Sequence, residues 1–192
     1  MTKDKAKILK LSPMNRLYYP LLLLLFSMTK STAADAQKTY SYLALGDSYT
    51  IGESLPLADN FPHQTVDLLR KKGKQFDQPT IVAKTGWTTD ELMAAIGKRE
   101  LKKQYDFVSL LIGVNNQYRG RDIQTYQKEF EELLKLAIQF AGGKPENVFV
   151  LSIPDWGATP FAEGRDREKI KKEIDQFNAA NHGISKSFKV NY

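Results

Sequence analysis

The chain has 192 residues, of which 42% are hydrophobic and 26% charged, which is enough for one domain with a substantial core but too few for two. Its formal net charge is +6, but residues 1–36 contribute most of that excess, so the rest of the chain gives no electrostatic reason to expect nucleic-acid binding. The absence of cysteine excludes a disulfide framework, a thiolate nucleophile and a cysteine-based zinc site.

The first 36 residues have the pattern of a secretory signal peptide. A lysine-rich start is followed by an apolar run over residues 17–28 and by the small-x-small sequence Ala34-Asp35-Ala36. That run is shorter than the ~20 residues that span a bilayer, and Pro20 interrupts it. We therefore expect cleavage after Ala36, export to the periplasm or the medium, and no stable membrane span afterwards. An uncleaved signal anchor is the alternative.

From residue 37 onward, short apolar segments alternate with longer amphipathic ones. The apolar segments predict four strands, over residues 40–45, 80–83, 107–112 and 148–153, and residues 187–192 predict the start of a fifth. The amphipathic segments predict helices over residues 61–72, 89–103, 123–141 and 165–184. Thr89 is expected to cap the second of these helices.

Alternation of this kind predicts an α/β fold, in which right-handed crossovers build a parallel sheet between layers of helices. No repeat, low-complexity segment or linker divides residues 37–192. We therefore expect one domain, a three-layer α/β/α sandwich with a flavodoxin-like parallel sheet. Ligands bind such sheets at the carboxyl ends of the strands, so the residues that follow each predicted strand are the candidates for chemistry.

A serine follows the first predicted strand, in the segment Gly46-Asp47-Ser48-Tyr49. A serine that opens a helix at the carboxyl edge exposes its hydroxyl and aims its own N–H into the pocket. That arrangement suits a nucleophile with a built-in oxyanion donor. The same residues are also good turn formers, because Asp and Ser both cap helices. Taken alone, this segment favours the turn.

Glycine and asparagine follow the second and third predicted strands. Gly86, in segment 84–89, lets a backbone N–H approach a substrate closely, although an ordinary strand-to-helix turn explains it as well. Asn115, in segment 113–120, has a side-chain amide that could donate to an oxyanion, although Asn115 and Asn116 also suit a turn.

Taken together and in order, the three segments resemble the blocks of the SGNH hydrolases, also called GDSL lipases or esterases. Residues 46–49 resemble the first block, Gly86 the second and residues 113–115 the third, and the resemblance extends over residues 39–192. It implies Ser48 as the nucleophile. It also implies an oxyanion hole formed by the N–H groups of Ser48 and Gly86 and the side-chain amide of Asn115. No metal and no organic cofactor is implied.

Two details refine the resemblance, one as a closer match and one as a departure. Segment 84–89 looks most like the lysophospholipase/thioesterase-like branch. The third block usually ends in Asn-Asp, whereas here Asn116 replaces the acid. Because the replaced position is not the oxyanion donor, we expect a local structural effect rather than lost chemistry.

The family supplies its catalytic base from an Asp-x-x-His block near the C-terminus, and this sequence has no such block. Its histidines are His63, at a predicted helix start, and His182, which precedes Gly183 at a predicted helix end. We therefore expect the catalytic Asp and His to be absent and the domain to be C-terminally incomplete, without the end of its fifth strand and its last helix. Such a domain should expose apolar surface on one side of the sheet and be poorly stable.

The loops after the strands are expected to shape the substrate pocket. The residues expected to line it are Asp47, Tyr118, Asp155 and Trp156. Asp155 follows the fourth predicted strand, so lining the pocket or closing a turn is a simpler role for it than membership of a catalytic triad.

Two functions stay open. The first is serine-dependent hydrolysis of carboxylic esters or thioesters, lysophospholipase- or esterase-like, through an acyl-enzyme. An acyltransferase with the same serine would look identical in sequence. The second is a truncated, non-catalytic remnant that binds acyl or carbohydrate ligands. In the enzyme hypothesis the partner is a small-molecule ester or thioester, and in both we expect a monomer.

Overall fold

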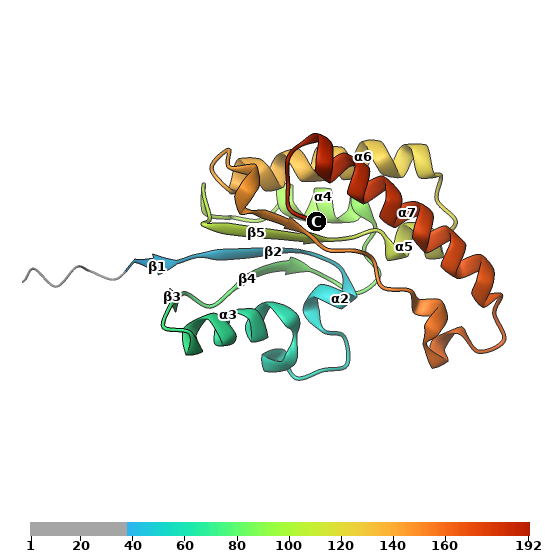
Figure 1. Ribbon diagram of the computed structural model, residues 1–192, viewed down its shortest axis with the longest axis horizontal. Helices are drawn as coiled ribbons and strands as arrows, with labels where there is room; N and C mark the ends of the chain where they lie inside the picture. The colour runs from blue at the N-terminus through green and yellow to red at the C-terminus, as the bar shows by residue number, and fades with distance from the viewer. Residues whose placement is uncertain (1–37) are drawn as a thin grey trace, which may run out of the picture. The chain divides into compact units, whose positions relative to one another are not determined.

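A computed structural model describes residues 38–192, so the predicted signal peptide lies outside the described residues. Strands and helices alternate along this part of the chain (Figure 1). The strands are β1 (Thr39–Tyr40), β2 (Tyr42–Gly46), β3 (Gln75–Phe76), β4 (Thr80–Ala83), β5 (Phe107–Leu111) and β6 (Val148–Val150). The α-helices are α2 (Ser48–Ile51), α3 (Phe61–Lys71), α4 (Thr89–Gly97), α5 (Val114–Tyr118), α6 (Ile123–Phe140) and α7 (Arg167–Ser187). Four 3-10 turns are η2 (Leu57–Asp59), η3 (Pro145–Asn147), η4 (Trp156–Ala158) and η5 (Pro160–Ala162).

The central sheet has four parallel strands in the order β4-β2-β5-β6. The chain starts inside the sheet with β2, crosses to one edge for β4, and then returns to the other side of β2 for β5 and β6. This flavodoxin-like order confirms the predicted parallel α/β fold. The reversal of direction beside β2 is a topological switch point, where ligands bind in sheets of this kind. None of the helices within residues 38–192 is long and apolar enough to cross a membrane.

The two faces of the sheet bury different side chains, because residues alternate along a strand. Leu43 and Leu45 of β2 belong to the larger core, which α4, α6 and α7 complete. Tyr42 and Ala44 of the same strand belong to a smaller cluster that includes Val66 of α3. Figure 1 shows α3 on one side of the sheet and α4, α6 and α7 on the other.

The face that α3 covers is only partly closed. The rings of Tyr40, Phe76, Phe107 and Phe149 pack in sequence across it, with centroids 5.2 to 6.3 Å apart. Phe149 remains 42% exposed. These four rings, together with Leu69 and Lys74, surround a hollow of about 310 Å³. Apolar surface is therefore exposed on this side of the sheet.

The C-terminal end differs from the prediction. The helix α7 runs to Ser187, beyond the predicted end at residue 184, because the N–H of Phe188 still bonds to the carbonyl of Ile184. Lys189 then adopts a left-handed φ of 58° and turns the chain toward the sheet. Only Asn191 pairs, in a single parallel bridge to Phe149 of β6. The predicted strand start at residue 187 is therefore wrong, and strand pairing begins four residues later.

The second predicted helix also differs at both ends. It stops at Gly97 rather than at residue 103, and its cap is Thr88 rather than Thr89. Thr88 forms a capping box with Glu91, whose carboxylate accepts the backbone N–H of Thr88 at 2.9 Å. Thr89 has another role, because its N–H donates to the side chain of Asn116 at 3.1 Å.

Candidate active site

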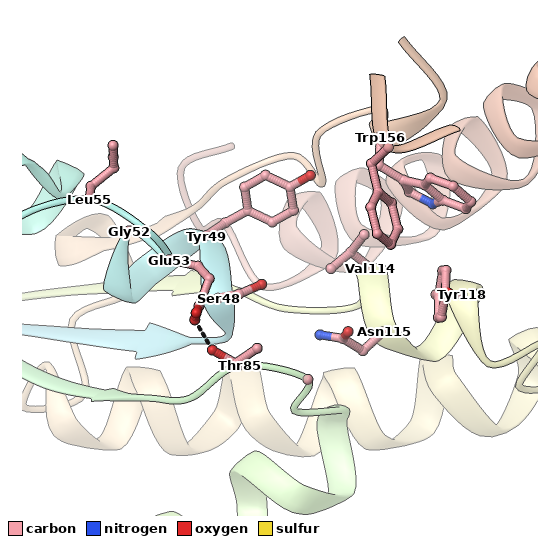
Figure 2. A pocket seen from close by; sticks show the side chains of 12 residues that line it. Ser48, Tyr49, Gly52, Glu53, Leu55, Thr85, Val114, Asn115, Tyr118 and Trp156 are labelled. Atoms are coloured by element: carbon pink, nitrogen blue, oxygen red, sulfur yellow. Dashed lines mark hydrogen bonds between the residues drawn. The ribbon is translucent and has the colours of Figure 1, made fainter. Parts of the chain in front are cut away.

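Three residues from three strand ends line one cavity of about 660 Å³. Ser48 follows β2, Gly86 follows β4 and Asn115 follows β5. They meet because β2 lies between β4 and β5 in the sheet, so Ser48 is flanked by the other two. Figure 2 shows the nitrogen end of the Asn115 amide turned toward Ser48.

The turn that carries Ser48 is capped by the residue before it. The buried Asp47 side chain accepts the backbone N–H of Tyr49 at 3.0 Å and so begins α2. Ser48 is half-buried and occupies the first position of this helix. At that position the backbone N–H has no acceptor within the helix, which leaves it available to a ligand.

Asp47 lies beneath the cavity rather than in it. It is 1% exposed and is not among the cavity-lining residues. Burial raises the pKa of Asp47 to about 7, although the hydrogen bond from the Tyr49 N–H works in the other direction. Its charge also helps to raise the pKa of Tyr126 of α6, for which burial is the main cause. Asp47 is thus placed as a helix cap and not as a substrate-lining residue.

The turn that carries Gly86 is held by side chains from outside it. Gly86 has a φ of 80°, a conformation that residues with a side chain rarely adopt. Its carbonyl oxygen accepts a hydrogen bond from Nη2 of Arg119 at 2.5 Å. The carbonyl of the next residue, Trp87, accepts Nδ2 of Asn115 at 2.9 Å. Both carbonyls are therefore bound by side chains that come from α5 or directly follow it.

The hydrogen bond to Trp87 fixes the Asn115 amide in the orientation that the cavity requires. A primary amide carries two N–H groups, and only one of them is needed for Trp87, so the second is available to a ligand. The chain reaches this position through Gly113, whose φ is 130°. A Cβ at Gly113 would collide with the hydroxyl of Tyr126, so glycine lets α5 begin directly after β5.

Asn116, which stands where the resemblance implies an acid, connects α5 to α4 through hydrogen bonds to Thr89. It is buried, accepts the N–H of Thr89 through Oδ1, and donates from Nδ2 to the Thr89 hydroxyl at 2.7 Å. That hydroxyl in turn donates to the carboxylate of Glu129 in α6. An amide suits this position because it presents one acceptor and one donor at once.

An aromatic wall closes the other side of the cavity. The rings of Tyr118, Trp156 and Phe161 pack against one another with centroids 5.3 to 6.2 Å apart. Trp156 is held in place by Gln117, whose side-chain oxygen accepts the indole N–H at 2.8 Å and whose amide donates to Glu173 of α7 at 2.7 Å. Tyr118 and Trp156 line the cavity as predicted, whereas Phe161 was not predicted. The available signal was its position as the one aromatic residue of loop 157–166.

The remaining predicted residue, Asp155, caps η4 instead of lining the cavity. Its Oδ1 accepts the N–H of Gly157 at 2.8 Å. The carboxylate that does line the cavity is Glu53, which accepts a hydrogen bond from the hydroxyl of Thr85 (Figure 2).

Neither of the two histidines, both within the described residues, lines the cavity. His63 lies in α3, with Nδ1 at 2.7 Å from the Asn60 side chain. The ring of His182 packs against that of Tyr192, with centroids 5.1 Å apart. His182 lies inside α7, so the prediction that it precedes a helix end at Gly183 is wrong.

Comparison with known proteins gives a family and a fold. The sequence profile of the GDSL-like Lipase/Acylhydrolase family matches residues 44–192. No curated protein is similar enough in sequence to be recognised as a relative. Among solved structures, TesA is similar with a TM-score of 0.61 at 16% identity, over 80% of this chain and 76% of its own. AlinE4, an SGNH-hydrolase family esterase, is similar with a TM-score of 0.59 at 16% identity, over 80% and 75%. Axe2, an acetylxylan esterase from Geobacillus stearothermophilus, is similar with a TM-score of 0.61 at 18% identity, over 79% and 74%.

Proposed function

Since the chain belongs to the GDSL-like lipase/acylhydrolase family, we propose that it hydrolyses carboxylic esters or thioesters with Ser48 as the nucleophile. The observation that carries the proposal is the meeting of Ser48, Gly86 and Asn115 at one cavity. The Ser48 hydroxyl attacks the acyl carbonyl, and the oxyanion that forms accepts hydrogen bonds from the two backbone N–H groups and the Asn115 amide. Loss of one such donor typically costs about 3 kcal/mol of transition-state stabilisation.

The reaction continues through an acyl-enzyme. The tetrahedral intermediate collapses, the C–O or C–S bond breaks, and the alcohol or thiol leaves with a proton while the acyl group stays on Ser48. Water then attacks this ester, which releases the carboxylic acid and restores the serine. A base has to accept the serine proton, and neither His63 nor His182 lines the cavity. Turnover is therefore the decisive measurement.

For the substrate we propose an ester or thioester with an extended apolar acyl group, as in lysophospholipids, rather than an acetyl ester. The cavity of about 660 Å³ is much larger than an acetyl group needs, and its wall of Tyr118, Trp156 and Phe161 offers apolar surface. The similarity to Axe2 does not weigh against this, because a shared fold does not determine a substrate.

The test compares p-nitrophenyl acetate, butyrate and octanoate as substrates of the full chain. We expect kcat/KM to rise with acyl length, by up to about fourfold per methylene group that the cavity buries. Ser48→Ala should reduce turnover at least about 10³-fold. Ser187→Ala, an exposed serine at the end of α7, is the matched control and should keep wild-type rates. Equal loss in both variants would contradict the proposal.

Binding without turnover is the second candidate, and the observation that favours it is the position of both histidines outside the cavity. In that case octanoate should quench or shift the fluorescence of Trp156 in a saturable way, while no p-nitrophenol is released. Trp156→Phe removes that signal but leaves Trp87 as the internal reference. Release of p-nitrophenol that depends on Ser48 would rule this candidate out.

We also propose that the protein is exported and acts as a monomer. The pattern of residues 1–36 supports export, and mass spectrometry of the protein recovered from a secreting host should find a new N-terminus at residue 37. Light scattering of that product would test the monomer.

A further inference from the structure

The turn over residues 86–88 is bound by a side chain at each of its three residues. Arg119 holds the carbonyl of Gly86 at 2.5 Å and Asn115 holds that of Trp87 at 2.9 Å. Glu91 accepts the N–H of Thr88 at 2.9 Å. The turn therefore has little freedom while these three side chains stay in place.

Arg119 joins the parts of this arrangement. Its backbone N–H donates to the carbonyl of Asn115 at 3.0 Å, so it lies one helical turn after the amide. Its guanidinium reaches Gly86 through Nη2 and the carboxylate of Glu91 through Nη1, at 3.3 Å. One planar fork thus connects the segment of Asn115 with the turn of Gly86.

Gly86 has one close neighbour on the side that a side chain would occupy. Among the residues the structure describes, and apart from residues 85 and 87, the guanidinium of Arg119 is the one group within 4 Å of the position that a Cβ of Gly86 would occupy, at 3.6 Å. A glycine with a φ of 80° has many other conformations available to it. Without Arg119, the turn would be free to change the direction of its backbone N–H.

We propose that Arg119 is a positioning residue that fixes the Gly86 turn relative to Asn115, so that the two donors converge on one oxyanion. The catalytic consequence rests on the proposed function, but the effect on the turn does not. The side chain of Arg119 is 41% exposed and that of Glu91 40%, so their ion pair contributes little to stability. Substitution should therefore disturb the turn without unfolding the protein.

Arg121 provides a matched control. It lies two residues after Arg119 and its side chain is 39% exposed. It forms an ion pair at 3.6 Å with Asp90, which lies beside Glu91 in the first turn of α4. Its exposure and its kind of partner are therefore those of Arg119, but no hydrogen bond connects it to the Gly86 turn. A difference between the two variants isolates the contact with Gly86.

The first measurement is the amide resonance of Gly86 in ¹⁵N-labelled full-length protein, which needs no activity. Arg119→Lys keeps the charge but has no fork to bridge Gly86 and Glu91. We expect this variant, and Arg119→Gln, to shift the Gly86 resonance. We also expect them to speed the hydrogen exchange of the Trp87 N–H, which bonds to the carbonyl of Lys84 at 3.3 Å, at least about tenfold by local opening. Arg121→Lys should leave both unchanged. An unperturbed Gly86 amide in both Arg119 variants would overturn the proposal.

The second measurement is phosphonylation of Ser48 by a fluorophosphonate, in which the serine oxygen bonds to phosphorus and fluoride leaves. The phosphoryl oxygen of the reagent occupies the oxyanion position. Arg119→Lys should therefore lower the maximal rate of phosphonylation about 10- to 100-fold, which is less than or similar to the effect of losing one oxyanion donor. The reagent concentration that gives half the maximal rate should change less than twofold. Arg121→Lys should react like the wild type, and equal rates in both variants would overturn the catalytic role. If wild-type Ser48 fails to react, the proposed function is wrong, and the Gly86 amide alone decides whether Arg119 holds the turn.

Discussion

The two faces of the central sheet are made by the same strands but are closed to different degrees. On one face α4, α6 and α7 bury side chains such as Leu43 and Phe130 completely. On the other, α3 contributes Val66 and Leu69 to a smaller cluster, and Phe149 stays 42% exposed beside an apolar hollow. The candidate site depends on the closed face, because α5 and η4 both pack on α7. We conclude that the geometry of the site and most of the stability come from that side.

Removing a large ring from each face tests this conclusion most directly. Phe130→Ala empties a fully buried position in α6, and we expect it to lower the free energy of unfolding by about 3–5 kcal/mol. Phe149→Ala should cost about 1 kcal/mol or less, because water already reaches that ring. Urea denaturation measures both. Equal losses would show that the open face contributes as much stability as the closed one.

The closed face also predicts a dependence on pH through Asp47. Burial raises the pKa of Asp47 to about 7, above its ordinary value, so the folded state keeps this proton longer than the unfolded state. The free energy of unfolding should therefore fall as the pH rises from about 4 to 7, by on the order of a few kcal/mol. Asp47→Asn keeps a cap acceptor but cannot ionise, so its advantage over the wild type should grow across that range.

Asp106, which precedes β5 at the opposite end of the strands, is the control for this effect. Burial alone would raise its pKa, but hydrogen bonds from Lys38 and Ser41 outweigh burial and lower the pKa. Asp106 therefore stabilises the folded state at pH values above its ordinary pKa, and this stabilisation is lost as the pH falls. The free energy of unfolding of Asp106→Asn should fall further below that of the wild type as the pH rises, which is the opposite of the trend for Asp47→Asn. Denaturant melts at several pH values separate the two, and a flat difference for Asp47→Asn would contradict the assigned pKa.

A smaller effect on stability is expected where hydrogen bonds connect Asn116 of α5, Thr89 of α4 and Glu129 of α6. In Asn116→Asp the single hydroxyl hydrogen of Thr89 would have to serve both the new carboxylate and Glu129, so one buried oxygen loses its donor. We expect a loss of about 1–3 kcal/mol in the free energy of unfolding.

Glu129→Gln is the compensating change. The glutamine amide can donate to the Thr89 hydroxyl, which then donates to the aspartate at position 116. The double variant should recover most of the lost stability in a double-mutant cycle. Strictly additive losses would show that Asn116 is not coupled to Glu129 through Thr89.

The amino-acid sequence by itself determined the four strands of the central sheet, the parallel α/β order, and which three residues meet at the cavity. These features follow from local signals, since apolar runs predict buried strands and glycine turns after parallel strands bring Ser48, Gly86 and Asn115 to one edge.

The tertiary structure decided which neighbours of those residues face the cavity and which hold it together. Asp47 is buried beneath the cavity as a helix cap and Phe161 belongs to the aromatic wall, although both lie in segments that were expected at the active edge. Arg119 reached Gly86, 33 residues earlier in the chain. The physical reason is that hydrophobic periodicity and turn chemistry are properties of adjacent residues. The direction of a loop side chain is set instead by packing and hydrogen bonds between segments that only folding brings together.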